Sequence, residues 1–307
     1  MTAAADAGTW TLGDRTVNRL GFGAMRLTGS RPFDPACVPS QRDQAVAVLR
    51  RAVELGVNHI DTAAFYFSAL RSANELINAA LAPYPDDLVI TTKVGPGRDA
   101  GGEWVPRARP DQLRGQVEEN IRQLGVDHLD VVNLRWGLRA GPIAEHFGAM
   151  ADLQHAGLIR HLGVSAVTAQ HLAEARAIAQ VVCVQNPYSV GARPDGHALL
   201  RECGELGVAF VPFFAIAGRG REDGVGADVP GDTARSHITA IAAAHGASAA
   251  QVRLAFTLAQ GPHVLAIPGT GNLAHLEGNV AAAAIRRTED ERARLESVTP
   301  AGSEVVW

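Results

Sequence analysis

Short apolar runs alternate with longer amphipathic stretches along most of this chain. The apolar runs contain many β-branched residues and have the length of single strands. Those around Val131, Val164, Val182 and Val208 are apolar nearly throughout, which is typical of parallel strands covered on both faces. The pattern predicts eight strands, at Arg19–Ala24, Val57–Asp61, Leu88–Lys93, His128–Leu134, Ile159–Val164, Val181–Gln185, Val208–Phe213 and Val264–Ile267.

The stretches between these runs have apolar residues three and four positions apart, which is the spacing of a helix with one buried face. Several of them end at a glycine that leads directly into a strand, as in Leu55-Gly56-Val57. Glycine accepts the left-handed geometry of a helix C-cap and therefore suits this position. The predicted helices are Gln41–Leu55, Gln112–Leu124, Ala144–Ala156, His171–Ala179, Ala198–Leu206 and Thr233–His245.

Eight strands that alternate with helices predict an α/β fold, the (β/α)8 TIM barrel, in which each helical crossover makes the next strand parallel to the last. A doubly wound sheet is the competing architecture. It usually has a glycine-rich turn after its first strand, and the segment Gly21–Arg26 does not match the G-x-G-x-x-G pattern. Thr9–Val17, with a Gly-Asp turn, predicts an N-terminal β-hairpin before the first strand. We expect a single domain over residues 1–307.

Composition and charge narrow the class of protein. The 307 residues carry a net charge of −4 without a basic patch, so nucleic acid is not an expected partner. Apolar runs stay below the ~18 residues of a membrane span, and residues 1–20 lack a signal pattern, so no membrane partner is expected. Cys37, Cys183 and Cys203 form no C-x-x-C pair, which disfavours disulfides and zinc sites and favours a cytoplasmic location.

One cationic residue differs in type from all the others. Lysine and arginine total 28, and Lys93 is the single lysine among them. The pKa of a lysine responds to its neighbours, whereas arginine stays charged, which indicates a function at this position that arginine cannot perform. Codon bias that left one lysine by chance is the alternative interpretation.

The carboxyl ends of barrel strands meet at one mouth, so residues at those ends are candidates for chemistry. The second predicted strand ends at Asp61, with Tyr66 shortly after it, and the third ends at Lys93. A carboxylate keeps a lysine cationic, and that cation is expected to lower the pKa of a nearby phenol from ~10 toward neutrality. Such a tyrosine can protonate a developing alkoxide. In the alternative interpretation Asp61 caps a turn, Tyr66 packs and Lys93 is a solvated strand end.

Further short motifs stand at the ends of the other predicted strands. The complete set is Asp61-Thr62-Ala63 with Tyr66, Thr92-Lys93, Gly163-Val164-Ser165, Gln185-Asn186, Phe213 and Ile267-Pro268-Gly269-Thr270. Together these motifs resemble the aldo-keto reductase superfamily, from Gly21 to Asn279, although each motif alone is weak. The amino-acid sequences of segments 131–135, 182–186 and 211–214 are most similar to those of a bacterial branch of the family that contains pyridoxal reductases.

This resemblance implies a barrel that binds a nicotinamide cofactor, NADPH in preference to NADH, without a Rossmann domain. It implies that Tyr66 is the proton donor, that Lys93 and Asp61 tune it, and that hydride passes to a carbonyl carbon. By position, Ser165 and Gln185 would hold the nicotinamide carboxamide. It also implies that Phe213 would stack on the nicotinamide ring. The remaining cofactor-binding residues lie where a short helix begins, a position that suits an anionic group of the cofactor: Pro268, Gly269, Thr270, His275 and Asn279.

The chain departs from the family at several of these positions. Most members have histidine at the end of the fourth strand, where this chain has Arg135. A guanidinium there has two donors for a carbonyl oxygen and suits a substrate with a phenolate, carboxylate or phosphate. In the alternative interpretation Arg135 pairs with a nearby acid and contacts no substrate. Ala166 replaces a common asparagine, which removes one expected hydrogen bond to the carboxamide.

These features predict an NADPH-dependent oxidoreductase that reduces a small aldehyde or ketone, aromatic or anionic in character, to an alcohol. Trp104 and Trp136 are candidates for an aromatic wall at the mouth, and the loops 95–109 and 215–232 are expected to set specificity. Reduction of a conjugated C=C bond and a non-enzymatic NADPH-binding sensor are the alternatives. A hydrolytic barrel is disfavoured because paired carboxylates and histidine clusters are missing from the strand ends. We expect a monomer or a weak homo-oligomer.

Overall fold

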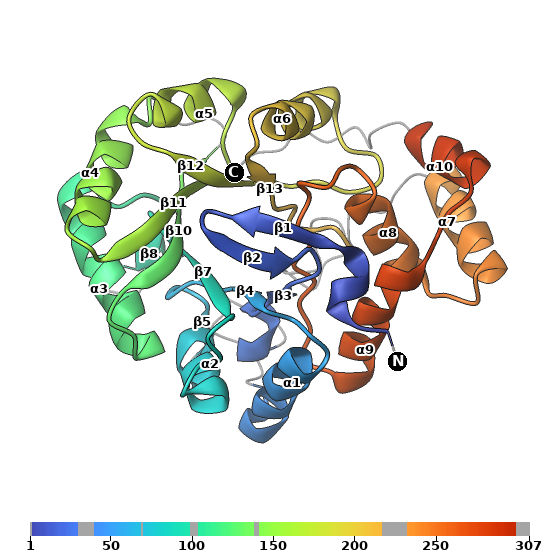
Figure 1. Cartoon of the computed structure of the whole chain (residues 1–307), viewed down its shortest axis with the longest axis horizontal. Coiled ribbons are helices and arrows are strands. Elements are labelled where there is room, and N and C mark those ends of the chain that lie inside the picture. Colours follow the sequence, from blue (N-terminus) through green and yellow to red (C-terminus); the bar gives the residue numbers. More distant parts are fainter. Residues whose placement is uncertain are drawn as a thin grey trace.

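The centre of the structure is a ring of parallel strands surrounded by helices (Figure 1). The computed structural model describes residues 2–29, 40–68, 70–98, 104–137, 141–216 and 232–298. Neighbouring strands of its seven-stranded sheet follow the order β3-β4-β7-β10-β11-β12-β13, so the sheet is built up in the order of the chain. The strands are β3 Phe22–Gly23, β4 His59–Asp61, β7 Val89–Val94, β10 Leu129–Arg135, β11 Ile159–Ser165, β12 Val181–Gln185 and β13 Ala209–Phe210.

A short segment near the end of the chain closes the ring between β13 and β3. It forms parallel bridges from Val264 to Phe210 and from Ala266 to Leu20. The prediction of a (β/α)8 barrel is therefore confirmed, but the eighth strand, expected at Val264–Ile267, is reduced to these two bridges. A proline on each side of the segment lacks the amide hydrogen that would extend the pairing.

Helices form the outer layer of the barrel (Figure 1). All six predicted helices are present, with α5 beginning two residues and α6 four residues earlier than expected. Thr168 caps the start of α5, and Pro194 occupies the first turn of α6, where its missing amide hydrogen is harmless. The helices are α1 Arg42–Glu54, α2 Ala73–Leu81, α3 Leu113–Leu124, α4 Ala144–His155, α5 Ala169–Arg176, α6 Pro194–Glu205, α7 Asp232–Ala244, α8 Ala249–Leu258, α9 Leu273–Ala281 and α10 Glu289–Glu296.

The helices α2, α8 and α10 have no counterpart among the predicted helices. Buried side chains follow one another directly in the second half of α8, so more than one face of that helix is covered. The buried side chains of α2 lie on one helical face between Ala73 and Leu81, a stripe that was missed in the sequence. In α10 the one buried side chain is that of Leu295. Shorter elements complete the connections: β1 Thr9–Leu12, β2 Arg15–Asn18, β5 Phe67–Ser68, β6 Arg71–Ser72, β8 Gly97–Arg98, β9 Trp104–Val105, η1 Ala4–Ala7, η2 Met25–Thr28, η3 Pro110–Gln112 and η4 Ala282–Ala284.

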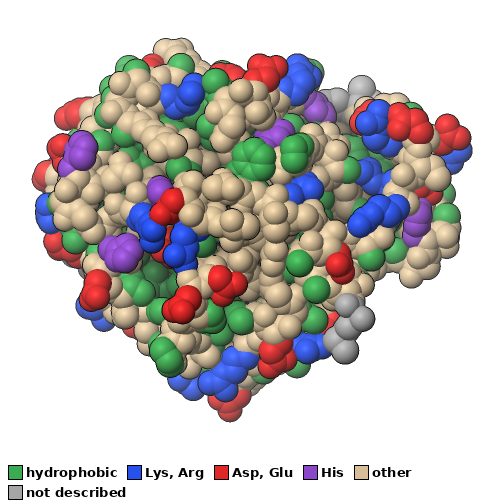
Figure 2. Space-filling view, in the orientation of Figure 1, with side chains coloured by type: hydrophobic (Ala, Val, Ile, Leu, Met, Phe, Trp, Pro, Cys, Tyr) green, Lys and Arg blue, Asp and Glu red, His purple; other side chains and the backbone are tan. Residues whose placement is uncertain are grey.

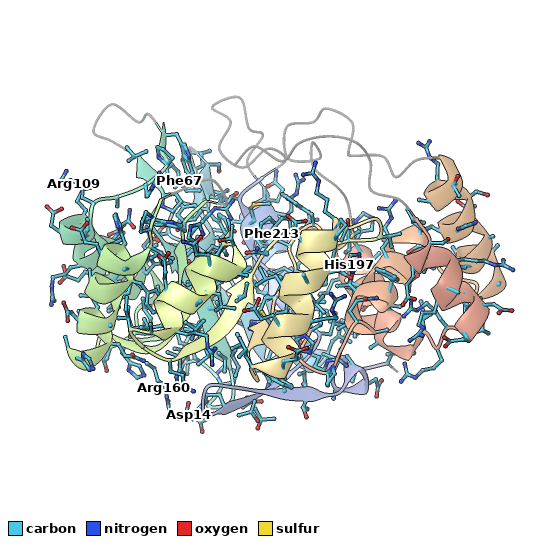
Figure 3. All side chains as sticks on the ribbon, turned by 90° about the horizontal axis from the view of Figure 1, so that it is seen from above. Asp14, Phe67, Arg109, Arg160, His197 and Phe213 are labelled. Carbon is cyan, nitrogen blue, oxygen red and sulfur yellow. The ribbon has the colours of Figure 1, made fainter. Side chains whose placement is uncertain are left out.

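The hairpin of β1 and β2 forms the floor of the barrel. Leu12 and Val17 pack in one apolar cluster with Val131 and other inward-facing residues of the strands. Figure 3 shows Asp14, in the hairpin turn, at the opposite side of the molecule from Phe213. The predicted N-terminal hairpin is thus confirmed, and it closes the end of the barrel opposite the carboxyl ends of the strands.

The outer surface on the hairpin side has mixed character (Figure 2). Charged side chains of both signs alternate around its edge, and hydrophobic side chains occur in small separate groups. In the part of the chain that the structure describes, every helix is too short or too polar to span a lipid bilayer.

Arg19 joins the two ends of the chain beneath the closing segment. Its guanidinium donates to the backbone carbonyls of Ala7 at 3.0 Å, Gly261 at 2.7 Å and Val264 at 3.2 Å, and also to that of Leu258. Burial lowers the pKa of the guanidinium from its ordinary value. Arginine nevertheless stays charged, so these are charge-assisted hydrogen bonds, which are stronger than neutral ones.

We expect the substitution Arg19→Met to lower the free energy of unfolding by about 3 kcal/mol, because it leaves several half-buried carbonyls without donors. Chemical denaturation followed by circular dichroism measures this change. Arg42→Met is the matched control, because the Arg42 side chain is 58% exposed, and we expect it to change stability by less than about 0.5 kcal/mol. Equal stability of the two variants would show that barrel closure does not depend on Arg19.

Candidate active site

A buried ion pair lies at the carboxyl ends of β4 and β7. Lys93 Nζ donates to Asp61 Oδ1 at 2.6 Å and to the Thr62 carbonyl at 3.0 Å. Asp61 is opposite Thr91 in the strand register, two residues before Lys93, so both charged side chains face the barrel interior. The side chains of Lys93 and Asp61 are 2% and 4% exposed, so the interpretation of Lys93 as a solvated strand end is wrong.

Tyr66 lies against this ion pair. Its amide donates to the Ala63 carbonyl at 3.0 Å, which folds the residues after β4 into a turn. Lys93 Nζ is 4.8 Å from the centroid of the Tyr66 ring, and the charge of the ammonium acts on the Tyr66 phenol. Phe65 meets the Tyr66 ring edge-on, with 5.3 Å between the ring centroids. The structure therefore brings Asp61, Tyr66 and Lys93 together.

Burial controls the pKa of the Tyr66 phenol. Loss of hydration raises this pKa, the Lys93 charge lowers it, the Asp61 charge raises it, and the Arg135 charge lowers it. The net shift is upward from the ordinary value, so the expectation of a phenol pKa moved toward neutrality is wrong. The free energy lost by burying the phenolate exceeds the free energy gained from its attraction to the neighbouring ammonium. The phenol consequently keeps its proton near neutral pH.

The other titratable groups in the barrel interior respond differently to the same burial. For Lys93, burial is the largest single influence and disfavours the ammonium, but the influences of Asp61 and Tyr66 together outweigh it and raise the pKa of Lys93. For His59 on β4, burial lowers the pKa to about 4, so the imidazole is neutral near pH 7. The charges that act on the Tyr66 phenol are thus Lys93, Asp61 and Arg135.

Gln185 and Ser165, at the ends of β12 and β11, carry unpaired polar atoms. Gln185 Nε2 donates to Asp61 Oδ2 at 2.7 Å, and Gln185 Oε1 is buried without a hydrogen-bond partner among the described residues. The hydroxyl of Ser165, opposite Gln185 in the register, is likewise buried and has no partner within the described ranges. Such atoms are rare in proteins and call for a ligand or water. One acceptor beside one donor fits a primary carboxamide, which has both an NH₂ and a carbonyl group.

A cavity of about 890 Å³ opens beside the Tyr66 phenol and extends to the start of α9. This volume is at the upper end of the range for ligand pockets, which suits an extended ligand together with a small one. Lys93 and Ser165 do not belong to its lining and lie buried next to it. The other predicted catalytic and cofactor-binding residues all line it: Asp61, Tyr66, Arg135, Gln185, Phe213, Pro268, Gly269, Thr270, His275 and Asn279.

The turn that follows the closing segment forms one end of the cavity. The Thr270 hydroxyl accepts from the Asn272 amide at 3.1 Å, and Asn272 Oδ1 accepts from the His275 amide at 3.1 Å at the start of α9. Gln44 Nε2 on α1 donates to the Gly271 carbonyl at 2.6 Å and ties α1 to this turn. The turn therefore presents a capped helix start, a location that favours negatively charged groups.

Arg135 is the last residue of β10 and lines the cavity next to Phe213. Its guanidinium carbon is 5.5 Å from the centroid of the Phe213 ring, which is a cation–π contact. Arg135 is opposite Ser165 in the register, so its side chain starts toward the barrel interior. Because its charge also acts on Tyr66, Arg135 places a permanent cation near the phenol.

Two residues beside the site have a strained backbone. Ala166 and Phe214 have φ values of 54° and 66°, the left-handed region, which costs an L-residue roughly 1–2 kcal/mol. Each directly follows a cavity-side residue, Ser165 in one case and Phe213 in the other, and such strain is concentrated at functional sites. Asparagine tolerates this conformation better than alanine, which gives a backbone reason for the asparagine that is common at position 166 in the resembling family.

The two tryptophans considered for the mouth have different positions. Trp104 lines the cavity, is 41% exposed and packs edge-on against Phe65, with 5.8 Å between the ring centroids. Trp136 is 5% exposed and does not belong to the lining. Its indole N–H donates to the Gly141 carbonyl at 2.8 Å, and Arg107 covers its ring at 4.7 Å. The expectation that Trp136 forms part of the mouth is therefore wrong.

Several residues that line the cavity were missed in the sequence. Met25 and Arg26 follow β3, and the strand-end argument would have found them if it had been applied to the first strand as well. Phe65 lies between two recognised residues of the second strand end. Gln44 and Gln251 belong to α1 and α8, and no motif in the sequence marks either of them.

Some expectations concern residues outside the described ranges. These are Cys37, residues 99–103 of the first specificity loop and residues 217–231 of the second. Cys183 and Cys203 are buried free thiols, and burial raises the pKa of each to about 12. Among the described residues, no group of three or more His, Cys, Asp or Glu side chains is placed to hold a metal ion.

A closed parallel barrel with a buried lysine–carboxylate pair and a phenol beside a long cavity defines a class of carbonyl oxidoreductases. A family model described as the aldo/keto reductase family matches residues 19–300. The chain therefore belongs to the aldo/keto reductase family, and the resemblance found in its motifs is confirmed.

Known proteins similar to this chain support the assignment. Pyridoxine 4-dehydrogenase of Escherichia coli (strain K12) is 41% identical over 297 residues, which cover 95% of this chain and 98% of that protein. A thermostable aldo-keto reductase, solved in complex with the inhibitor epalrestat, is 30% identical with a TM-score of 0.76, covering 93% of this chain and 97% of that one. An aldo-keto reductase from Klebsiella pneumoniae, solved in complex with NADPH, is 26% identical with a TM-score of 0.75, covering 100% and 98%.

We expect the substitution Lys93→Met to lower the free energy of unfolding by about 3–5 kcal/mol, because it leaves the Asp61 carboxylate buried without its cation. The double variant Lys93→Met/Asp61→Asn removes both charges and should recover most of this loss. Denaturant titrations of the two variants and the wild type measure the difference. If the double variant is no more stable than Lys93→Met, the unpaired carboxylate is not the cause of the loss.

Proposed function

We propose that this protein catalyses the NADPH-dependent reduction of a small aromatic aldehyde to an alcohol, with Tyr66 as the proton donor. The observation that carries the proposal is the contact of Lys93 with both Asp61 and Tyr66 beside the cavity. In this contact the Tyr66 phenol holds the proton, and the Lys93 cation stabilises the phenolate once the proton has left. Membership of the aldo/keto reductase family supports carbonyl reduction as the reaction type.

The proton needed at the carbonyl oxygen comes from the Tyr66 hydroxyl. Burial raises the pKa of this phenol, so the donor is loaded before the reaction begins. The Lys93 ammonium, held by Asp61 and the Thr62 carbonyl, hydrogen-bonds the Tyr66 oxygen as negative charge develops there. Alcohol oxidation requires the phenolate instead, so oxidation should become faster as pH rises, while aldehyde reduction should slow above the phenol pKa.

When bound, the reduced nicotinamide supplies the hydride. We assign its carboxamide to the Ser165 hydroxyl and Gln185 Oε1, which are buried and lack partners among the described residues. Phe213 offers an aromatic face for stacking within the cavity. The similar Klebsiella pneumoniae structure in complex with NADPH supports this cofactor in preference to NADH. The residues assigned to the phosphates and the adenosine are Pro268, Gly269, Thr270, His275 and Asn279.

The proposed substrate is a planar aldehyde with an ionised ring oxygen, of which pyridoxal is an example. Trp104 and Phe65 form an aromatic wall, and Arg135 supplies a cation on the same cavity. An aromatic wall suits a planar ring, and a guanidinium binds a phenolate oxygen by charge-assisted hydrogen bonds. The relative from Escherichia coli is named pyridoxine 4-dehydrogenase, and pyridoxal is the aldehyde that corresponds to pyridoxine.

We expect Tyr66→Phe to lower kcat for pyridoxal reduction by about 10²–10⁴-fold, because the proton donor is lost while the ring remains. The Kd for NADPH should stay within about twofold, since cofactor contacts are kept. Loss of the reduced-cofactor absorbance measures turnover, and fluorescence titration measures binding. Tyr84→Phe is the matched control, because the Tyr84 hydroxyl donates to the Leu124 carbonyl at 2.6 Å away from the cavity.

A Tyr66→Phe variant with full kcat would remove Tyr66 from the acid role. A wild-type protein that oxidises neither NADPH nor NADH with any aldehyde of a broad panel would refute the proposed function as a whole, and tight binding of NADPH in that case would favour the sensor alternative. With an enone as substrate, a saturated ketone in place of an allylic alcohol would favour reduction of the C=C bond.

We expect Arg135→Met to lower kcat/KM for 3-hydroxypyridine-4-carbaldehyde by about 10–100-fold, because a hydrogen bond between charged groups contributes about 1.5–3 kcal/mol. Pyridine-4-carbaldehyde lacks the ring oxygen, and its kcat/KM should change by less than about threefold. Arg107→Met serves as the control, because Arg107 covers Trp136 and does not line the cavity. Equal losses for the two aldehydes would contradict a role of Arg135 in reading the substrate charge.

A further inference from the structure

Four buried polar side chains form a hydrogen-bonded chain on the outer side of β4 and β7. Thr62 Oγ1 donates to Asn74 Oδ1 at 2.7 Å, and Asn74 Nδ2 donates to Asn120 Oδ1 at 2.9 Å. Thr92 Oγ1 donates to the same Asn120 oxygen at 2.6 Å. Asn74 belongs to α2 and Asn120 to α3, and all four residues have 0% exposed surface. The chain of contacts thus connects two helices to two strand ends.

Both threonines are next to the buried ion pair along the backbone. Thr62 follows Asp61, and its carbonyl accepts from Lys93 Nζ at 3.0 Å. Thr92 precedes Lys93 on β7. Successive side chains of a strand point to opposite faces. The threonine side chains therefore face the helices and hold the backbone in place, while the neighbouring charged residues, Asp61 and Lys93, face the barrel interior.

The contacts within this polar chain are complete. Asn120 uses its oxygen for two donors, and its Nδ2 donates to the Gln116 carbonyl at 2.9 Å. A buried polar group without a partner destabilises a protein, whereas a fully satisfied network is rigid and defines positions more narrowly than apolar packing does. Helix–sheet adhesion alone would be served equally well by apolar side chains at these positions.

We propose that Thr62, Asn74, Asn120 and Thr92 are positioning residues that fix Lys93 Nζ against the Tyr66 oxygen. An ammonium has three N–H groups, and Lys93 directs one to Asp61 and one to the Thr62 carbonyl, which leaves the third for the Tyr66 phenol beside it. A shift of the backbone at either threonine misaligns the donor that must hold the phenolate. This inference rests on the proposed role of Tyr66 as the proton donor.

Valine substitutions test the proposal, because Thr62→Val and Thr92→Val each remove one hydroxyl and keep the side chain branched. Thr62→Ser is the conservative variant, because it keeps the hydroxyl and removes only the methyl group. Thr257→Val on α8 is the matched control, since the Thr257 hydroxyl is also fully buried and donates to the Arg253 carbonyl at 3.0 Å. The measurements are kcat and KM for pyridoxal, the Kd for NADPH, and the pH profile of pyridoxine oxidation, all with the full chain.

We expect kcat to fall about tenfold or more in both valine variants, at positions 62 and 92. Losses of about this size follow when hydrogen bonds that orient functional side chains are removed from metal sites. KM and the NADPH Kd should stay within about twofold, because neither hydroxyl reaches the cavity. The rise of pyridoxine oxidation with pH should move to higher pH, because a displaced ammonium stabilises the phenolate less. Thr62→Ser should recover the wild-type values, and Thr257→Val should retain them.

Wild-type kcat and pH profile in both valine variants would overturn the proposal, as would an equal loss in Thr62→Ser and Thr62→Val. If Thr62→Val does not fold, the same measurements on Thr92→Val decide. Tyr66→Phe keeps the two hypotheses separate. Full activity of Tyr66→Phe would refute the proton-donor assignment, whereas an inactive Tyr66→Phe beside fully active valine variants would refute the positioning role alone.

Discussion

The burial of one ammonium and one carboxylate inside the barrel determines most of the site. An ion pair removed from water is tolerated only when its remaining donors and acceptors are also satisfied. Asp61 Oδ2 therefore accepts a hydrogen bond from Gln185 Nε2, and Lys93 Nζ donates one to the Thr62 carbonyl. One carboxylate thereby joins strands β4, β7 and β12. The Gln185 amide nitrogen is used in this way, and its oxygen has no hydrogen-bond partner among the described residues.

The same burial decides the protonation state of the Tyr66 phenol. Tyr66 is surrounded by the charges of Lys93, Asp61 and Arg135, and the loss of hydration is the largest of the influences on its pKa. A protonated phenol is the form that a reductase needs before the reaction. Arg135 adds a charge that histidine would carry only at lower pH, so the electrostatic character of the site varies little across the physiological range.

The parts of this structure that could be predicted are those set by short-range pattern and by topology. The barrel followed from alternating strand and helix patterns, and the meeting of Asp61 with Lys93 followed from the rule that strand ends converge. The direction of the Tyr66 pKa could not be predicted, because it depends on how completely distant segments enclose the ring. Likewise nothing in the spacing of Asn74 and Asn120, 46 residues apart, indicates that they are hydrogen-bonded.

The ring of strands is completed by a segment that lies close to the end of the chain, where Ala266 bridges to Leu20. Arg19 and its partner Gly261 are 242 residues apart. During synthesis on the ribosome, the free edges of β3 and β13 must wait for this segment to emerge. Unpaired strand edges readily join those of other chains. The nascent protein is therefore most exposed to misassembly until this segment has emerged and paired with β3 and β13, which is the stage at which chaperones would protect it most.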